Sequence, residues 1–197
     1  YDILMGFWER HSNHDMMRII AKNGKQAKIL ELGVGSGHLL SLLAEKFPES
    51  EITGLDYSSG MIAASKRLLE KQAARNPNEA HVDFLHCDCF KLPKQLEGQD
   101  IIASSFLFDI QSHERIMALL KESSRILKPG GHLVIAVLDG AVESSPRNRA
   151  AKAFFNLANS FYHVCYESKT LREISHQLFN GYYTHCRPID IASCIKD

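Results

Sequence analysis

Three glycines that alternate directly after an apolar run make residues 29–40 a candidate ligand site. The stretch reads ILELGVGSGHLL, with glycine at positions 33, 35 and 37 and a leucine-rich segment behind them. Glycine has no Cβ, so a ligand can approach the backbone closely, and a helix that begins after the turn offers unpaired N–H groups. A strand that runs through such a turn into a helix predicts a binding loop.

The charges near the turn indicate which ligand it suits. The dinucleotide pattern G-x-G-x-x-G requires glycine where this chain has His38, and no Gly-Lys-Ser/Thr follows as in a phosphate loop. Glu31 precedes the turn, and the turn itself carries no Lys or Arg. Asp56 closes the next apolar run, where a carboxylate can accept hydrogen bonds from ribose hydroxyls. A ligand with a ribose and cationic groups but no phosphate fits, and S-adenosylmethionine has this composition.

The order of several short motifs resembles that of the class I S-adenosylmethionine-dependent methyltransferases. The motifs are ELGVGSG (31–37), LDYSSGMI (55–62), CDCFKLP (87–93), DIIASSFLFDI (100–110) and SSRILKPGGHLVIA (123–136). The resemblance covers residues 28–138, and the segment that follows more loosely. One such motif alone is weak evidence, but several in the family's order and spacing favour the whole assignment.

The resemblance implies a role for each motif. Asp56 would accept from the ribose, Met61 would pack on the adenine, and Asp88 would accept from its exocyclic amine. The expected cofactor-binding residues are Glu31, Gly33, Val34, Gly35, Gly37, Asp56, Tyr57, Met61, Asp88, Cys89, Ser104 and Ser105. Structural roles stay open as alternatives, with Asp56 as a helix cap, Asp88 as a turn former and Met61 as plain core.

The acceptor of the methyl group should lie beyond the carboxyl ends of the strands. Three segments could reach it, residues 1–11, 104–110 and 161–167. The expected substrate-binding residues are Trp8, Phe106, Tyr162, His163 and Tyr166. The aromatic residues of the third segment could equally be the packing face of an insertion.

Methyl transfer is an in-line displacement at a sulfonium carbon, so positioning supplies much of the rate. A general base is needed only when the acceptor keeps its proton at neutral pH. The absence of an obvious catalytic dyad therefore does not count against the assignment, and no catalytic residue is named. If a base exists, His163 is the first candidate and Tyr162 or Tyr166 the next.

Apolar runs that alternate with helical patterns should position these residues. Strands are expected at 28–32, 51–56, 81–86, 100–105, 131–138, 182–186 and 189–195, and helices at 37–47, 59–75, 112–127 and 170–179. The sequence SNHD at 12–15 fits a capping box and should start a further helix, with Met16, Ile19 and Ile20 as its apolar stripe. KPGG at 128–131 should close the third helix.

Near-continuously apolar strands indicate a parallel sheet with helices on both faces. The resemblance implies an α/β, Rossmann-like, doubly wound sheet of seven strands, order 3-2-1-4-5-7-6, with an antiparallel last strand. We expect one methyltransferase domain over 1–197. It would comprise an N-terminal helical segment over the active site (1–27), the cofactor-binding core (28–138), a substrate-side insertion (139–169), and a closing helix and hairpin (170–197).

Composition narrows the class of partner. Lys and Arg together number 23, as do Asp and Glu. A protein that binds the phosphate backbone of nucleic acids usually has more basic than acidic residues. We therefore expect a small-molecule substrate and no nucleic acid. No apolar run approaches the roughly 18 residues of a membrane span. Five cysteines without disulfide-like spacing, and no secretory signal pattern, favour a cytoplasmic protein.

A metal site, NAD-dependent oxidation and cofactor sensing are the other functions to compare with methyl transfer. HSNHD (11–15) and HCDC (86–89) could suggest a metal, but a solvated helix start and a packed strand end explain them better, so no metal is expected. A short-chain NAD oxidoreductase should show G-x-x-x-G-x-G and Y-x-x-x-K, and the chain has neither. The alternative that stays open is a non-catalytic S-adenosylmethionine-binding regulatory module.

Overall fold

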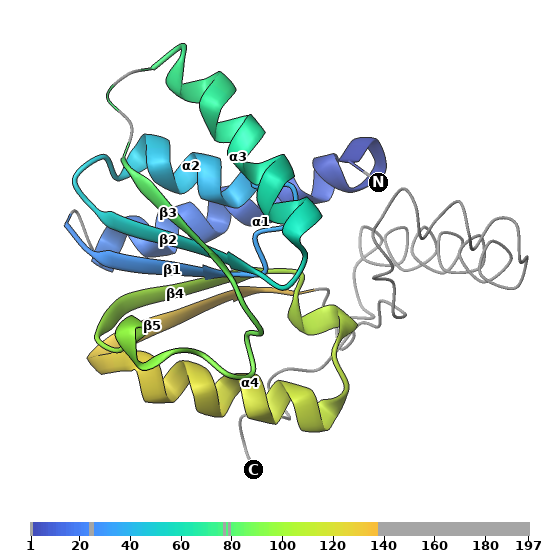
Figure 1. Cartoon of the computed structure of the whole chain (residues 1–197), viewed down its shortest axis with the longest axis vertical. Coiled ribbons are helices and arrows are strands. Elements are labelled where there is room, and N and C mark those ends of the chain that lie inside the picture. Colours follow the sequence, from blue (N-terminus) through green and yellow to red (C-terminus); the bar gives the residue numbers. More distant parts are fainter. Residues whose placement is uncertain (1, 24–25, 77, 79, 138–197) are drawn as a thin grey trace, which may run out of the picture. The chain divides into compact units, whose positions relative to one another are not determined.

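A parallel five-stranded sheet carries the candidate site (Figure 1). The computed structural model describes residues 2–23, 26–76, 78 and 80–137. The strands are β1 (Lys28–Leu32), β2 (Glu51–Asp56), β3 (Val82–His86), β4 (Gln99–Ser105) and β5 (Leu127–Ala136), in the order β3-β2-β1-β4-β5. All four pairings are parallel, which confirms the first five positions of the expected order. The expected helix at 170–179 and the two strands after it lie outside the described residues.

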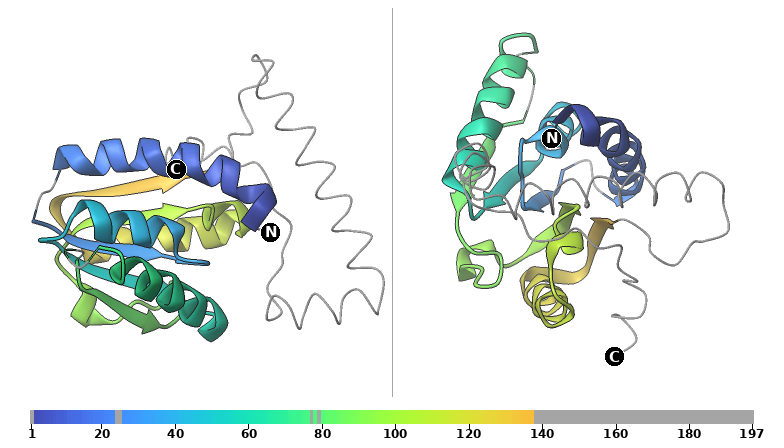
Figure 2. Two further views of the ribbon diagram at one scale, coloured as in Figure 1. Left: turned by 90° about the horizontal axis from the view of Figure 1, so that it is seen from above. Right: turned by 90° about the vertical axis from the view of Figure 1, so that its right-hand side faces the viewer.

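Helices cover both faces of this sheet, as expected for a doubly wound fold (Figures 1 and 2). They are α1 (Asp2–Asn23), α2 (His38–Lys46), α3 (Ser59–Ala73) and α4 (His113–Ile126), with short 3-10 turns η1 (Lys94–Leu96) and η2 (Phe108–Ile110). The first three lie on one face and α4 lies on the other. Residues 1–108 and 112–136 form one compact unit that contains the sheet and these helices, and a second unit comprises 109–111 and 137–197.

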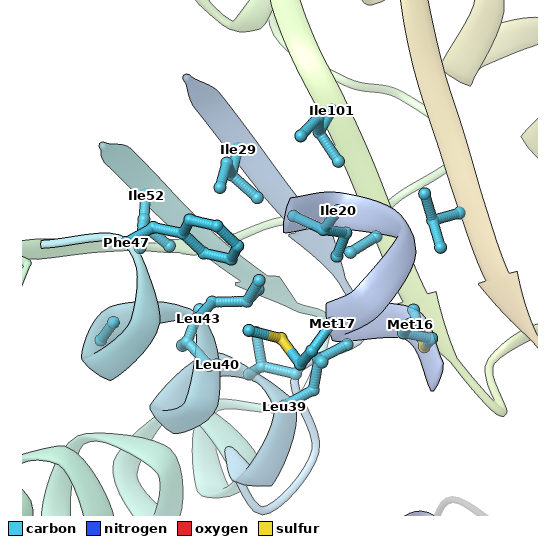
Figure 3. Close-up of a cluster of buried hydrophobic side chains, with 14 of the residues drawn as sticks. Met16, Met17, Ile20, Ile29, Leu39, Leu40, Leu43, Phe47, Ile52 and Ile101 are labelled. Atoms are coloured by element: carbon cyan, nitrogen blue, oxygen red, sulfur yellow. The ribbon is translucent and has the colours of Figure 1, made fainter. Parts of the chain in front are cut away.

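The core between α1, α2 and the sheet fixes the N-terminal helix in place (Figure 3). Its buried side chains include Met16, Met17, Ile20, Ile29, Leu39, Leu40, Leu43, Phe47, Ile52 and Ile101. Burial of apolar surface stabilises by about 25 cal/mol per Å². The expected stripe was wrong at one position, because Ile19 is 48% exposed and Met17 is buried instead.

The start predicted for the N-terminal helix was also wrong. Helix α1 begins at Asp2 and runs through the supposed capping box at 12–15. The upstream turns supply helical partners for these N–H groups, so no side-chain cap is needed there. Asn13 is 2% exposed, and its Oδ1 accepts a hydrogen bond from Ser105 Oγ at 3.2 Å. Asn13, which we predicted to lie at the start of a helix, therefore contacts the end of β4.

The fifth strand begins earlier than predicted. Leu127 follows α4 directly and pairs with Gln99, so KPGG lies inside β5 instead of forming a turn before it. The register is irregular between Gln99 and Ile101 and then continues with Ile101 opposite His132. A backbone bond from Gly98 N to Ile126 O, 2.8 Å long, holds this corner. The irregular pairing accommodates the additional residues at the start of β5. The pattern of apolar and polar residues in the sequence does not reveal such an irregularity.

Among the described residues, no helix has the length and hydrophobicity to cross a lipid bilayer.

Candidate functional site

The glycine turn after β1 is hydrogen-bonded to the end of β2. Leu32 lies opposite Leu55 in the parallel register. The N–H groups of Gly33 and Val34 both donate to Leu55 O, at 2.8 and 3.0 Å. The expected glycine motif and the expected acidic motif therefore meet at the carboxyl edge of the sheet, where open α/β sheets bind their ligands.

Each glycine of the turn has a left-handed backbone, but the surroundings of Gly35 and Gly37 differ. The φ values of Gly33, Gly35 and Gly37 are +72°, +51° and +90°. A Cβ built on Gly35 meets no atom within 4 Å, whereas one on Gly37 would lie 2.8 Å from Ser65 Cβ. Gly35 thus borders open space, and Gly37 is packed against α3.

Asp56 joins the glycine turn to the start of α3. Its Oδ2 accepts from Gly35 N at 3.0 Å, and its Oδ1 accepts from Ser58 N at 2.8 Å. The N-cap of α3 is Ser58, whose hydroxyl accepts from Met61 N at 3.3 Å, so Asp56 is not that cap. Each carboxylate oxygen has a second lone pair, so Asp56 can still accept hydrogen bonds from a ligand.

Tyr57 and Met61 follow this carboxylate in the chain, Tyr57 directly after it and Met61 in the first turn of α3. The Tyr57 side chain is 56% exposed, which is unusual for a large aromatic residue. His86 Nε2 donates to Tyr57 O at 2.7 Å and so ties the ends of β2 and β3 together. Met61 is half-buried in the first turn of α3 and is not part of the core cluster. Both residues are thus at least partly exposed to solvent.

The loop after β3 presents Asp88 and Cys89. Asp88 Oδ1 accepts from Phe90 N at 3.0 Å, so this carboxylate does shape the local turn. Cys89 is buried, and burial, followed by the charge of Asp88, raises the pKa of its thiol to about 12. Burial also raises the pKa of the Cys87 thiol. At neutral pH the two sulfurs are neutral thiols, so neither is an activated nucleophile.

The serines at the end of β4 are engaged by the protein itself. Ser104 is 0% exposed and its hydroxyl donates to Leu32 O at 3.1 Å, just before the glycine turn. Ser105 donates to Asn13, as described above. Glu31 and Val34 are likewise buried, at 1% and 4% exposure. The side chains of Glu31, Val34 and Ser104 are thus buried in the protein at or next to the turn.

Phe106 is the next residue and has an unusual backbone. Its φ is +58°, and it is the one non-glycine residue with positive φ among those described. Its N–H donates to Ala136 O at 2.9 Å, which holds this conformation against β5. Strained backbone of this kind costs about 1–3 kcal/mol and clusters at functional sites. Of the other expected substrate-binding residues, Trp8 lies in α1 and Tyr162, His163 and Tyr166 lie outside the described residues.

Sequence reasoning missed several residues that shape this edge. They are Asn13, His86, Arg115, Glu122 and Arg125. Their contacts with other segments do not follow from residue type or spacing, because the partners lie elsewhere in the chain: Ser105 for Asn13, Tyr57 for His86, Phe90 for Arg115, and Leu92 for Glu122 and Arg125. In the described part of the chain, no three His, Cys, Asp or Glu side chains come close enough to hold a metal ion.

The fold and the edge together define a class of protein. A doubly wound parallel sheet with a glycine turn bonded to an acidic residue on the neighbouring strand is a nucleoside-binding α/β domain. A model of the family described as "Methyltransferase domain" matches residues 29–131, just over half of the chain. The chain belongs to this family, whose cofactor is S-adenosylmethionine, and the resemblance inferred from its motifs is confirmed.

Several curated relatives carry methyltransferase names. A demethylmenaquinone methyltransferase of Thermotoga maritima is 36% identical over 136 residues, which are 68% of this chain and 50% of that protein. A malonyl-[acyl-carrier protein] O-methyltransferase of Methylococcus capsulatus is 33% identical over 115 residues, 58% of this chain and 38% of that protein. The chain spans about half the length, or less, of the curated relatives it matches.

Solved methyltransferase structures share the fold. N-methyltransferase NodS of Bradyrhizobium japonicum, in complex with S-adenosyl-L-homocysteine, matches with a TM-score of 0.54 at 20% identity. The match covers 64% of this chain and 60% of that chain. Magnesium protoporphyrin IX methyltransferase of Synechocystis matches with a TM-score of 0.52 at 15% identity, over 61% of this chain and 52% of that chain.

Proposed function

We propose that this chain binds S-adenosylmethionine at the carboxyl edge of β1–β3 and transfers its methyl group to a small-molecule acceptor. The observation that carries this proposal is the junction of Gly35 and Asp56. Gly35 borders open space, and its N–H lies 3.0 Å from a carboxylate oxygen that can accept further bonds. The turn from Gly33 to Gly37 carries no basic side chain, so the edge suits a ribose and cationic groups better than a phosphate.

The residues present fit the parts of this cofactor. Asp56 would accept from the ribose hydroxyls, and Tyr57 and Met61 would pack on the adenine. Asp88 and the N–H of Cys89 would bond the adenine edge, and the backbone of Gly33–Gly37 would line the methionine portion. Glu31, Val34, Ser104 and Ser105, which the sequence also indicated, would support these groups. The bound cofactor supplies the activated methyl group, and the chain supplies binding and orientation.

We place the acceptor-binding side of the site next to Phe106, the strained residue directly after β4. Phe106 stands where the sheet edge meets the methyl group in this proposal, and its fixed backbone would aim the acceptor in line. Trp8, Tyr162, His163 and Tyr166 are proposed to complete that side. The relatives are named for demethylmenaquinone and for malonyl-[acyl-carrier protein], in which the malonyl group is itself small. With the equal numbers of acidic and basic residues, these names support a small-molecule group as the acceptor.

S-adenosylhomocysteine should raise the melting temperature of the protein, and NAD should not. A ligand that binds only the folded state at a hundredfold excess over its dissociation constant adds about 2.7 kcal/mol of stability. For a chain of this size that corresponds to a shift of roughly 5–10 °C. Thermal shift with both ligands at matched concentrations makes the test. Equal stabilisation by NAD would argue against the site chemistry, and no shift with S-adenosylhomocysteine would contradict the proposed function.

The variant Asp56→Asn should weaken S-adenosylhomocysteine binding by about tenfold. Asparagine keeps the shape and one acceptor oxygen but loses the charge that strengthens hydrogen bonds from the ribose. Because Asp56 also accepts from Gly35 and Ser58, a lower melting temperature should accompany the loss. Calorimetric titration measures the affinity.

The matched control for this variant is Ser58→Ala. It removes the N-cap of α3, one residue beyond Tyr57, which should cost about 1 kcal/mol in stability. Ser58 is not among the residues expected to bind the cofactor. If the two variants lower affinity equally, the loss reflects damage to the β2–α3 junction, and Asp56 has no direct role in binding.

A further inference from the structure

The loop after β3 depends on α4 for its position. At its start, Cys87 N donates to Asp56 O at 3.2 Å, which ties the loop to the end of β2. Lys91 N donates to Asp88 O at 3.0 Å, a bond that closes a local turn but anchors nothing outside the loop. The anchor at the other end comes from side chains of α4, at Leu92.

Both backbone polar groups of Leu92 bond to a single ion pair. Its N–H donates to Glu122 Oε2 at 3.3 Å, and its carbonyl accepts from Arg125 Nη2 at 2.7 Å. Leu92 is 5% exposed, so its peptide groups need partners within the protein. The Glu122–Arg125 pair supplies both of these partners.

The geometry of this pair requires an arginine. Arg125 Nε and Nη2 donate to the two oxygens of Glu122 at 3.3 and 2.8 Å, and Nη1 reaches Glu97 Oε1 at 2.9 Å. One planar fork thus bonds two carboxylates and the Leu92 carbonyl together. A lysine ammonium is a compact point charge and cannot hold all of them in one plane. The hydrogen bond and charge of Arg125 also hold the pKa of Glu122 below its usual value, as expected for a carboxylate paired with a guanidinium.

A second contact from α4 acts on the same loop. The Arg115 guanidinium lies 4.0 Å from the centre of the Phe90 ring, within the range of a cation–π interaction. Arg115 and Arg125 therefore contact the loop on either side of Lys91. The segment between Cys87 and Leu92, which carries Asp88 and Cys89, is held at both ends and in its middle.

We propose that Arg125 is a positioning residue for the cofactor, which acts by fixing Leu92 and so the loop that presents Asp88 and the Cys89 N–H. The inference rests on the proposed function. A loop that is already ordered loses little conformational freedom when a ligand binds, so affinity is higher. Arg125 itself donates to Glu97, Glu122 and the Leu92 carbonyl, so in this proposal it acts on the cofactor only through the loop.

The test compares Arg125→Lys with Arg18→Lys. Arg18 also pairs with a carboxylate three residues away, Asp15, at 3.7 Å, and both side chains are about three-quarters exposed, at 72%. Calorimetric titration with S-adenosylhomocysteine should give a dissociation constant about tenfold higher for Arg125→Lys and an unchanged value for Arg18→Lys. Titrations are run well below the melting temperature of each variant.

A purely structural role is distinguished by hydrogen exchange. Amides of residues 89–92 should exchange faster in free Arg125→Lys than in the free wild type, and saturating S-adenosylhomocysteine should restore their protection. Glu122→Gln provides a second variant in case Arg125→Lys fails to fold. It keeps one acceptor oxygen without the charge, so a smaller loss of about threefold is expected.

Each outcome decides a different claim. Wild-type affinity in Arg125→Lys and Glu122→Gln would overturn the role of Arg125. A lower affinity in these variants with no change in hydrogen exchange at residues 89–92 would overturn it as well. Failure of the wild-type protein to bind S-adenosylhomocysteine would overturn the proposed function itself.

Discussion

Replacing Gly35 with alanine should remove most of the affinity for S-adenosylhomocysteine and leave the protein folded. A Cβ at this position meets no protein atom within 4 Å, so it would project into the open space in which the ligand is proposed to bind. Forced overlap with a bound ligand costs about 1–3 kcal/mol, which at its upper end corresponds to a loss of about a hundredfold. The φ of +51° adds a stability cost of roughly 1 kcal/mol for alanine. Calorimetric titration and thermal melting measure the two effects.

Gly98 provides a matched control for this backbone cost. It has a φ of +88°, and a Cβ built there also meets nothing within 4 Å. Gly98 lies between η1 and β4 and is not among the proposed cofactor-binding residues. Gly98→Ala should therefore lose a similar amount of stability and retain wild-type affinity. If Gly35→Ala binds as tightly as Gly98→Ala, the ligand does not approach the turn at Gly35.

The variant Gly37→Ala should instead destabilise the fold, by about 3 kcal/mol or more. An added Cβ would lie 2.8 Å from Ser65 Cβ and 2.9 Å from Ser65 Cα, and the backbone cannot move away as a flexible side chain could. The left-handed φ of +90° adds strain to the overlap. Urea unfolding at a fixed temperature measures the loss, and the midpoint should fall well below that of Gly35→Ala.

Ser65→Ala tests the packing partner on its own. Ser65 is 0% exposed, and its hydroxyl has no hydrogen-bond partner among the described residues. Removal of a buried hydroxyl that makes no bond should leave stability unchanged or raise it slightly. An unchanged urea midpoint for Gly37→Ala would show that α3 does not pack against the turn as described.

Much of the cofactor-side architecture could be predicted because it rests on local signals. The bounds of β1 and β2 match the predicted strands, since buried parallel strands read as short apolar runs bounded by turns. The glycine spacing and Asp56 identified the edge, because backbone freedom and a carboxylate at the end of a strand are visible in the residue types themselves. The motif order was enough to indicate the family, which the family match confirms.

Errors occurred where a local signal was compatible with two structures. SNHD reads as a capping box, but upstream turns made it the interior of α1. KPGG is typical of a helix end, but in the structure it lies inside β5, where the pairing with β4 has an irregular register. For SNHD the preceding turns of the same helix decided the outcome, and for KPGG the pairing of β5 with the distant strand β4, of which spacing along the chain carries no record.

The sequence by itself determined the alternation of strands and helices over residues 28–136, the glycine turn and the type of ligand that this turn suits, because each depends on residue type and short-range spacing. The strand order came from the resemblance to the family, and the structure confirms its first five positions. Only the tertiary structure showed that Gly35 borders open space while Gly37 is packed on Ser65, although both are glycines of one turn. Only the tertiary structure brought Arg125 to the backbone of Leu92, 33 residues away in the chain. The physical reason is that packing and long-range hydrogen bonds depend on which segments become neighbours, and this is settled when helices and strands assemble around a common core.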